Sequence, residues 1–138
     1  MSRRRREPTW LTVTQAMVLH AETLGLFGGK SGLRDKGLLE SAIARPQQIF
    51  GYEEDVSLFD LAAGYCYGLC RNHPFVDGNK RTGVLLIRAF LFMNGFSFVP
   101  VEAETVTMIE MVASDEITEA SLSEWIEQSS KKRGSKKR

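Results

Sequence analysis

The sequence predicts an all-α protein, a bundle of about six helices around a buried central helix. Two helix starts and one apolar segment support this prediction. Thr12 to Gln15 and Ser57 to Asp60 show the pattern of a capping box, in which the first and fourth residues satisfy each other's backbone amides. From Asn79 to Asn94 apolar side chains occupy almost every face of the expected helix, which is typical of a helix surrounded by others.

The other elements follow from apolar spacing and turn residues. The first helix is expected to end at Gly25, and the second, capped by Asp35, is expected to end before Pro46. The segment from Phe96 to Pro100 is expected to be short and extended. Two last helices follow, the second of them capped by Ser121.

Charge is unevenly distributed along the 138 residues. Ten of the 18 basic residues lie in the two ends, at Arg3–Arg6 and Lys131–Arg138, whereas all 17 acidic residues lie between these ends. We expect basic disordered tails at 1–10 and 129–138 around one folded domain at 11–128. Because that body is acidic, we expect no direct binding of nucleic acid. No apolar run approaches the length of a membrane span and no signal peptide is recognised, which predicts a cytoplasmic protein without a membrane partner.

Three patterns that can indicate ligand sites have simpler interpretations. Cys66 and Cys70 lack the further ligands that zinc requires, so we expect buried thiols. His20 lies within the apolar stripe of the first helix, where a packed or hydrogen-bonded core histidine is expected. The segment from Gly28 to Ser31 resembles the end of a phosphate-binding loop, but Leu24 stands where that loop requires glycine. We interpret the segment as a glycine-rich connection.

The chemically informative segment runs from His73 to Thr82, between the third and fourth helices. Free amides at a helix start bind anions, and Gly78 lets a phosphate approach the backbone closely. Lys80 and Arg81 add positive charge at the helix end where the dipole disfavours it. This arrangement predicts a polyphosphate as counter-anion.

Two further side chains complete the groups needed for phosphoryl or nucleotidyl transfer. Asp77 offers an oxygen ligand for Mg²⁺, which commonly bridges a carboxylate and phosphates. His73 lies just before the turn, where an imidazole can take a proton from an incoming hydroxyl. The alternative interpretation is a capped helix start with a surface cluster of ion pairs.

These residues resemble the Fic/Doc family. The segment from His73 to Asn79 and the later Arg81 match the Fic-branch motif His-Pro-Phe-x-(Asp/Glu)-Gly-Asn-Gly-Arg-x-x-Arg. Lys80 replaces the second glycine of that motif, and Val84 replaces its second arginine. Both departures match the Doc branch, the death-on-curing toxins, whose motif contains Asn-Lys-Arg-Thr.

The resemblance extends over about 11–128 and implies both a fold and an activity. Doc-like toxins are protein kinases that use ATP as co-substrate, with Mg²⁺, to phosphorylate a threonine of elongation factor Tu and arrest translation. A cognate antitoxin of the Phd type is the implied partner. By this resemblance His73 is the catalytic base and Asp77 is the Mg²⁺ ligand. The implied ATP- and phosphate-binding residues are Gly78, Asn79, Lys80, Arg81 and, as a further contact, Arg71.

The two departures suggest how kinase activity would arise. A glycine at position 80 would leave room for the β-phosphate, and an arginine at position 84 would hold the far end of the nucleotide. The Lys80 side chain fills that room, and the Val84 side chain cannot bind the nucleotide. Both features favour a nucleotide bound in the inverted direction, with its γ-phosphoryl group rather than its α-phosphoryl group facing the target. Two alternatives stay open: a Fic-type transferase of AMP to a protein hydroxyl, and a catalytically silent module that binds a nucleotide or a partner.

In the Fic family a loop beside the site pairs with an extended segment of the target through main-chain bonds. We expect Gln47–Val56, between the second and third helices, to be this loop. Its acidic residues Glu53, Glu54 and Asp55 would attract a basic target surface. The alternative is a solvated acidic connection.

Overall fold

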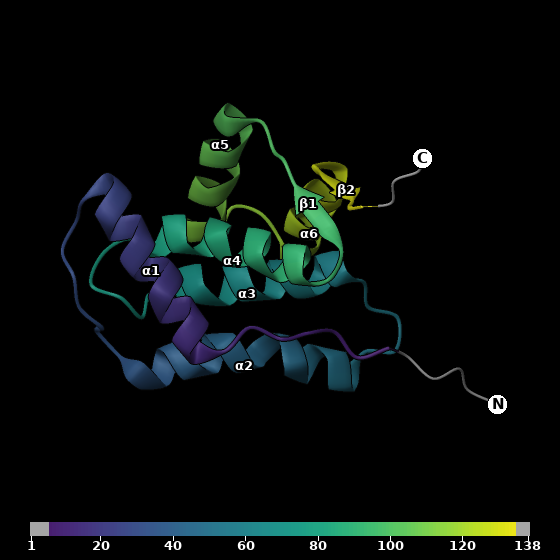
Figure 1. Ribbon diagram of the computed structural model, residues 1–138, viewed down its shortest axis with the longest axis horizontal. Helices are drawn as coiled ribbons and strands as arrows, with labels where there is room; N and C mark the ends of the chain where they lie inside the picture. Colours follow the sequence, from purple (N-terminus) through teal and green to yellow (C-terminus); the bar gives the residue numbers. More distant parts are fainter. Residues whose placement is uncertain (1–5, 135–138) are drawn as a thin grey trace.

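The computed structural model describes residues 6–134 and forms a bundle of six helices with one small two-stranded sheet (Figure 1). In chain order the elements are α1 (Val13–Phe27), α2 (Lys36–Tyr52), α3 (Leu58–Asn72), α4 (Asn79–Met93), β1 (Phe96–Phe98), α5 (Glu102–Ala113), α6 (Glu119–Gln128) and β2 (Ser130–Lys132). The all-α prediction is confirmed. Across the described residues, no helix combines the length and the apolar character that a membrane crossing requires.

The centre of the bundle is shared by α3 and α4. Nine of the 15 residues of α3 are buried, and this helix packs against α2, α4 and α6. The sequence predicts α4 alone as the central helix. Only seven of the 15 residues of α4 are buried, fewer than in α3. Phe92 and Arg88 on its outer side are exposed, because no element covers them completely.

Small residues allow α2 and α4 to approach α3 closely. A Cβ atom on Gly68 would lie 3.5 Å from the Cα atom of Ala42 in α2. A Cβ atom on Gly83 of α4 would lie 3.1 Å and 3.2 Å from the sulfur atoms of Cys66 and Cys70. Both cysteines are free and buried, as expected. Their thiols therefore fill the interface between the two central helices.

The predicted helix starts are largely confirmed. Thr12 and Ser57 each form a complete capping box, and the Asp35 side chain accepts a hydrogen bond from the third amide of α2. The last helix differs from the prediction, because Thr118 and not Ser121 is its N-cap. These caps depend on residues three apart in sequence, so they are recognisable without tertiary information.

The second helix continues past Pro46, where the sequence prediction ended it. An internal proline costs about 3 kcal/mol, because it removes a backbone hydrogen bond and crowds the preceding turn. Pro46 is buried, and its Cγ atom would lie 3.5 Å from a Cβ atom on Gly64 of α3. Packing of the proline ring against α3 offsets this cost, so α2 extends to Tyr52.

The folded region is longer at both ends than the sequence predicts. Trp10 stacks on Phe90 with a ring-centroid distance of 6.0 Å, so residues before position 11 belong to the fold. At the other end β2 pairs with β1 in antiparallel register, with Lys132 opposite Phe96. The predicted boundaries at 10 and 128 are therefore wrong. The remainder of the predicted tails, at 1–5 and 135–138, lies outside the described residues.

Candidate active site

The turn between α3 and α4 is held from inside by two buried polar side chains. Asn79 accepts a hydrogen bond from the amide of Phe75 at 3.0 Å and donates one to the carbonyl oxygen of Phe75 at 2.9 Å. The buried ring of Phe75 stacks on His20 with a centroid distance of 3.7 Å. The Nε2 atom of His20 lies 2.8 Å from the carbonyl oxygen of Asp77. His20 is therefore the hydrogen-bonded core histidine that the sequence predicts.

This geometry determines which group of Asn79 is available to a phosphate. Its amide oxygen and nitrogen are both bonded to Phe75, and the residue is 3% exposed. What Asn79 can offer a phosphate is its backbone amide, because it is the first residue of α4. The side chain fixes the shape of the turn instead.

The loop between α1 and α2 runs along the same turn and closes its other side. The amide of Val76 donates to the carbonyl oxygen of Gly32 at 3.0 Å, and the amide of Arg34 donates to Pro74 at 2.7 Å. Leu33 forms an isolated antiparallel bridge with Phe75. The sequence predicts only a glycine-rich connection here and does not reveal these contacts. Its one signal was glycine density, and Gly28, Gly29 and Gly32 all have positive φ angles.

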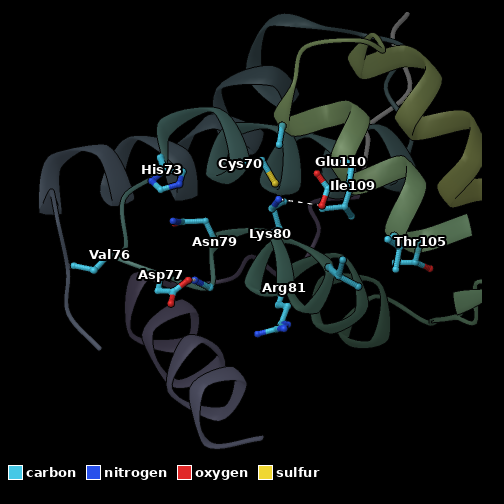
Figure 2. Close-up of a pocket in the computed structure, with 14 residues that line it drawn as sticks. Cys70, His73, Val76, Asp77, Asn79, Lys80, Arg81, Thr105, Ile109 and Glu110 are labelled. Atoms are coloured by element: carbon cyan, nitrogen blue, oxygen red, sulfur yellow. Dashed lines mark hydrogen bonds and ion pairs between the residues drawn. The ribbon is translucent and has the colours of Figure 1, made fainter. Parts of the chain in front are cut away.

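A cavity of about 690 Å³ opens between this turn, the start of α4 and the facing side of α5 (Figure 2). Its volume lies in the range typical of small-molecule and cofactor sites. Most of the predicted site residues line the cavity, namely His73, Asp77, Gly78, Asn79, Lys80 and Arg81. Apolar side chains also line it, among them Val84 of α4 and Val106, Ile109 and Ala113 of α5.

The start of α4 offers backbone amides to this cavity. Gly78 is the N-cap of α4 and has a left-handed conformation with φ of 79°, which glycine adopts without strain. Within the described chain, no side chain caps this helix start. The first amides of α4 therefore lack partners inside the helix, which is the usual arrangement of an anion site.

Two cations lie beside these amides. The Nζ atom of Lys80 is 3.1 Å from the Oε2 atom of Glu110 in α5. The guanidinium of Arg81 lies over the ring of Phe27, 4.6 Å from its centroid. Lys80, Arg81 and Glu110 all line the cavity. Glu110 was not singled out by the sequence, because it is 30 residues from Lys80 and belongs to no motif.

Arg71 is directed away from the cavity, contrary to its expected role as a phosphate contact. Its Nη1 atom lies 2.6 Å from the Oδ1 atom of Asp115 and 3.0 Å from the hydroxyl of Tyr67. The guanidinium also lies 5.4 Å from the centroid of the Tyr67 ring. Arg71 does not line the cavity. These contacts explain its position without any phosphate.

Asp77 is exposed at the edge of the cavity and is held by backbone amides. Its Oδ2 atom accepts from the amide of Lys30 at 3.2 Å, and its Oδ1 atom accepts from the amide of Gly78 at 2.9 Å. These hydrogen bonds, with a smaller contribution from the charge of Arg81, hold the pKa of the Asp77 carboxyl below its ordinary value. The carboxylate is therefore ionised at neutral pH and is oriented before any ligand arrives.

This carboxylate fits a Mg²⁺ ion that is shared with a polyphosphate. Magnesium is usually bound by one or two carboxylates together with substrate phosphates and water. Within residues 6–134 no group of three or more His, Cys, Asp or Glu side chains could hold a metal by itself. A single oriented carboxylate beside an anion site agrees with magnesium better than with zinc, which requires three or four protein ligands.

His73 occupies a backbone conformation that is uncommon for residues other than glycine. It ends α3 with φ of 54° and ψ of 54°, and its side chain lines the cavity. In the part of the chain that the structure describes, its ring makes no hydrogen bond. The ring nitrogens are therefore available to a substrate hydroxyl.

The segment Gln47–Val56 is not close to this site, so the prediction for the target-binding loop is wrong. Its first six residues form the last turns of α2. The remaining residues precede the start of α3, whereas His73 lies at the end of that helix, about 22 Å away. The loop 28–33 is next to the cavity instead, because it contacts Val76 and Asp77, which line the cavity.

Comparison with known proteins agrees with this geometry. Residues 10–91 match the model of the Fic/DOC family, a span that includes α1, α2, α3, most of α4 and the whole turn. The chain belongs to the Fic/DOC family.

Within that family the chain is similar to a curated protein from Mycolicibacterium smegmatis named Toxin Doc. The two are 47% identical over 70 residues, which cover 50% of this chain and 54% of the relative. The chain thus matches about half the length of this relative. The match agrees with Lys80 and Val84 in supporting the Doc branch.

Proposed function

We propose that this protein is a Doc-like toxin, a protein kinase that transfers the γ-phosphoryl group of ATP to a threonine or serine hydroxyl. The observation that carries the proposal is the position of Lys80. Lys80 lines the cavity at the start of α4, at the position where the Fic-branch motif has glycine. A nucleotide placed as the Fic branch places it would need that space.

The proposed reaction assigns one task to each polar group of the cavity. His73 takes the proton of the target hydroxyl, and the hydroxyl oxygen attacks the γ-phosphorus as the bond to ADP breaks. The amides at the start of α4, together with Lys80 and Arg81, stabilise the negative charge on the phosphoryl oxygens. Asp77 would hold Mg²⁺, which supplies charge neutralisation of the phosphates when it is bound.

The target in this proposal is a translation factor of the elongation factor Tu type, and the reaction takes place in the cytoplasm. The support for this target is the resemblance to Doc toxins, and the similar protein is itself named a Doc toxin. We place the docking segment at 28–33 in place of Gln47–Val56. This loop lies beside the Asp77 end of the cavity, where its backbone could pair with an extended target segment.

A cognate antitoxin of the Phd type is the second proposed partner. The support is the resemblance to toxins that act in toxin–antitoxin pairs. Pull-down with a candidate antitoxin, followed by an activity assay of the complex, tests it: the antitoxin should bind and lower the transfer rate. Binding without any effect on the rate would contradict a role as inhibitor.

The test of the reaction type uses ATP labelled at either end of the phosphate chain. Purified protein is incubated with Mg²⁺ and elongation factor Tu, once with γ-³²P-ATP and once with α-³²P-ATP. Phosphoryl transfer labels the target only from the γ-position, whereas AMP transfer labels it only from the α-position. Label from the α-position would refute the proposal in favour of the Fic-type alternative. No label from either position would favour the silent binding module.

A further inference from the structure

Two acidic side chains line the cavity, and they differ in what they contact. Asp77 is bonded to backbone amides, as described above. Glu110 instead contacts the cation that should receive the phosphates: its Oε2 atom lies 3.1 Å from the Nζ atom of Lys80 (Figure 2). The structure therefore already contains a carboxylate at one of the expected positions of an anionic ligand.

We propose that Glu110 competes with the polyphosphate for Lys80, so that an ion pair within the protein sets the affinity of the site for its nucleotide. This inference rests on the proposed phosphate site but not on the reaction that follows. A polyphosphate carries several negative charges, and Glu110 both occupies the Lys80 ammonium and adds a negative charge within the cavity. Tight binding therefore requires the Lys80–Glu110 contact to break.

The surroundings of the pair allow this exchange. The side chain of Lys80 is 49% exposed and that of Glu110 is 62% exposed, so water can hydrate the carboxylate once it is displaced. In α5 only Ile109 and Val112 are buried, and no side chain caps the start of the helix at Val101. The carboxylate can leave Lys80 without opening the core, because the Glu110 side chain is mostly exposed and is not part of the core.

The opposite role for Glu110 makes a different prediction. If the carboxylate held Lys80 in the correct position for the phosphates, its removal would leave Lys80 less ordered and weaken binding. Competition predicts that removal strengthens binding. The sign of the change in affinity therefore separates the two roles.

The first experiment measures binding of inorganic tripolyphosphate to the full chain by titration calorimetry. We expect Glu110→Gln to bind about three- to tenfold more tightly than the wild type at low ionic strength, with a smaller gain at high salt because the pair is exposed. Glu116→Gln is the matched control, because it removes the same charge just beyond α5 at a residue that does not line the cavity. Equal or weaker binding by Glu110→Gln would overturn the inference.

The second experiment repeats the comparison of Glu110→Gln with its parent protein in a variant that lacks the Lys80 amine. In a Lys80→Gln background, Glu110→Gln should give a much smaller gain, since there is no cation left to compete for. An undiminished gain would mean that the carboxylate acts through charge repulsion alone and would overturn the inference.

A third measurement follows the Lys80 amine itself. Acylation of Lys80 by an N-hydroxysuccinimide ester, followed by peptide mass spectrometry, should be faster in Glu110→Gln and unchanged in Glu116→Gln. An unchanged rate at Lys80 in Glu110→Gln would contradict the inference. Phosphoryl transfer is assayed separately, so tighter binding without transfer would refute the proposed kinase and leave the role of Glu110 supported.

Discussion

The Nε atom of Arg34 donates a hydrogen bond to the carbonyl oxygen of His73 at 2.8 Å. Its Nη2 atom also donates to the carbonyl oxygen of Asn72, at 2.9 Å. These two carbonyl groups end α3, where a cation is favoured by the helix dipole. The paired hydrogen bonds fix the left-handed backbone from which the His73 ring projects into the cavity. A residue of the α1–α2 loop thus positions the proposed catalytic base.

Replacement of Arg34 by alanine should slow phosphoryl transfer more than it weakens nucleotide binding. The base would lose its fixed position, and a displacement of about 1 Å can cost on the order of 100-fold in rate. Single-turnover rates and titration with tripolyphosphate measure the two effects separately. Arg34→Lys, which keeps the charge but loses the paired geometry, should lie between wild type and alanine. A wild-type rate in Arg34→Ala would contradict the positioning role.

Lys80→Gly should reopen the space at the start of α4 and weaken phosphoryl transfer. We expect no gain of AMP transfer, because Val84 still stands where the Fic branch has its second arginine. Labelling of the target from γ- and α-labelled ATP measures both activities in one assay. If Lys80→Gly were as active a kinase as the wild type, the proposed inverted orientation of the nucleotide would be wrong.

Asn79→Ala should destabilise the protein, because it leaves the buried amide and carbonyl of Phe75 without partners. Each unsatisfied group costs about 1–3 kcal/mol of unfolding free energy. Urea denaturation measures this loss. Unchanged stability together with weaker phosphate binding would contradict this structural role and indicate that the Asn79 side chain binds the phosphate.

Gly29→Ala should disturb Asp77 and raise the Mg²⁺ concentration needed for activity. The added Cβ atom would lie 2.9 Å from the Oδ2 atom of Asp77, and Gly29 has φ of 125°, which strains any other residue. Gly25→Ala is the control, because Gly25 is helical and a Cβ atom there meets nothing within 4 Å. The Mg²⁺ dependence of the transfer rate measures the effect. Identical curves for the two variants would contradict a metal-binding role for Asp77.

Much of the fold could be predicted because its signals are local. The capping boxes at Thr12 and Ser57 join residues only three apart, and the apolar run of α4 is continuous in sequence. The predicted end of α2 before Pro46 is wrong because the free-energy cost of a proline inside the helix is offset by packing against Gly64, a tertiary contact with α3. The prediction of a disordered tail at the residues of β2 is wrong for the same reason, because these residues are ordered by pairing with β1.

The candidate site shows the same division between local and distant signals. His73, Asp77 and Lys80 lie within eight residues, and the structure brings all three to one cavity. The residues that hold or oppose them come from elsewhere in the chain, with Arg34 in the α1–α2 loop and Glu110 in α5. Arg71 is near the motif in sequence, but the helical geometry directs it toward Asp115.

The central claim is that this protein transfers a phosphoryl group through His73, and intact mass spectrometry of the target tests it most directly. Elongation factor Tu is incubated with Mg²⁺-ATP and either the wild type or His73→Ala, a variant that should keep its fold and bind tripolyphosphate. We predict a gain of about 80 Da with the wild type and a rate at least about 100-fold lower with His73→Ala. A gain of about 329 Da, the mass of an AMP group, would contradict the account. So would a His73→Ala variant that keeps more than about a tenth of the wild-type rate.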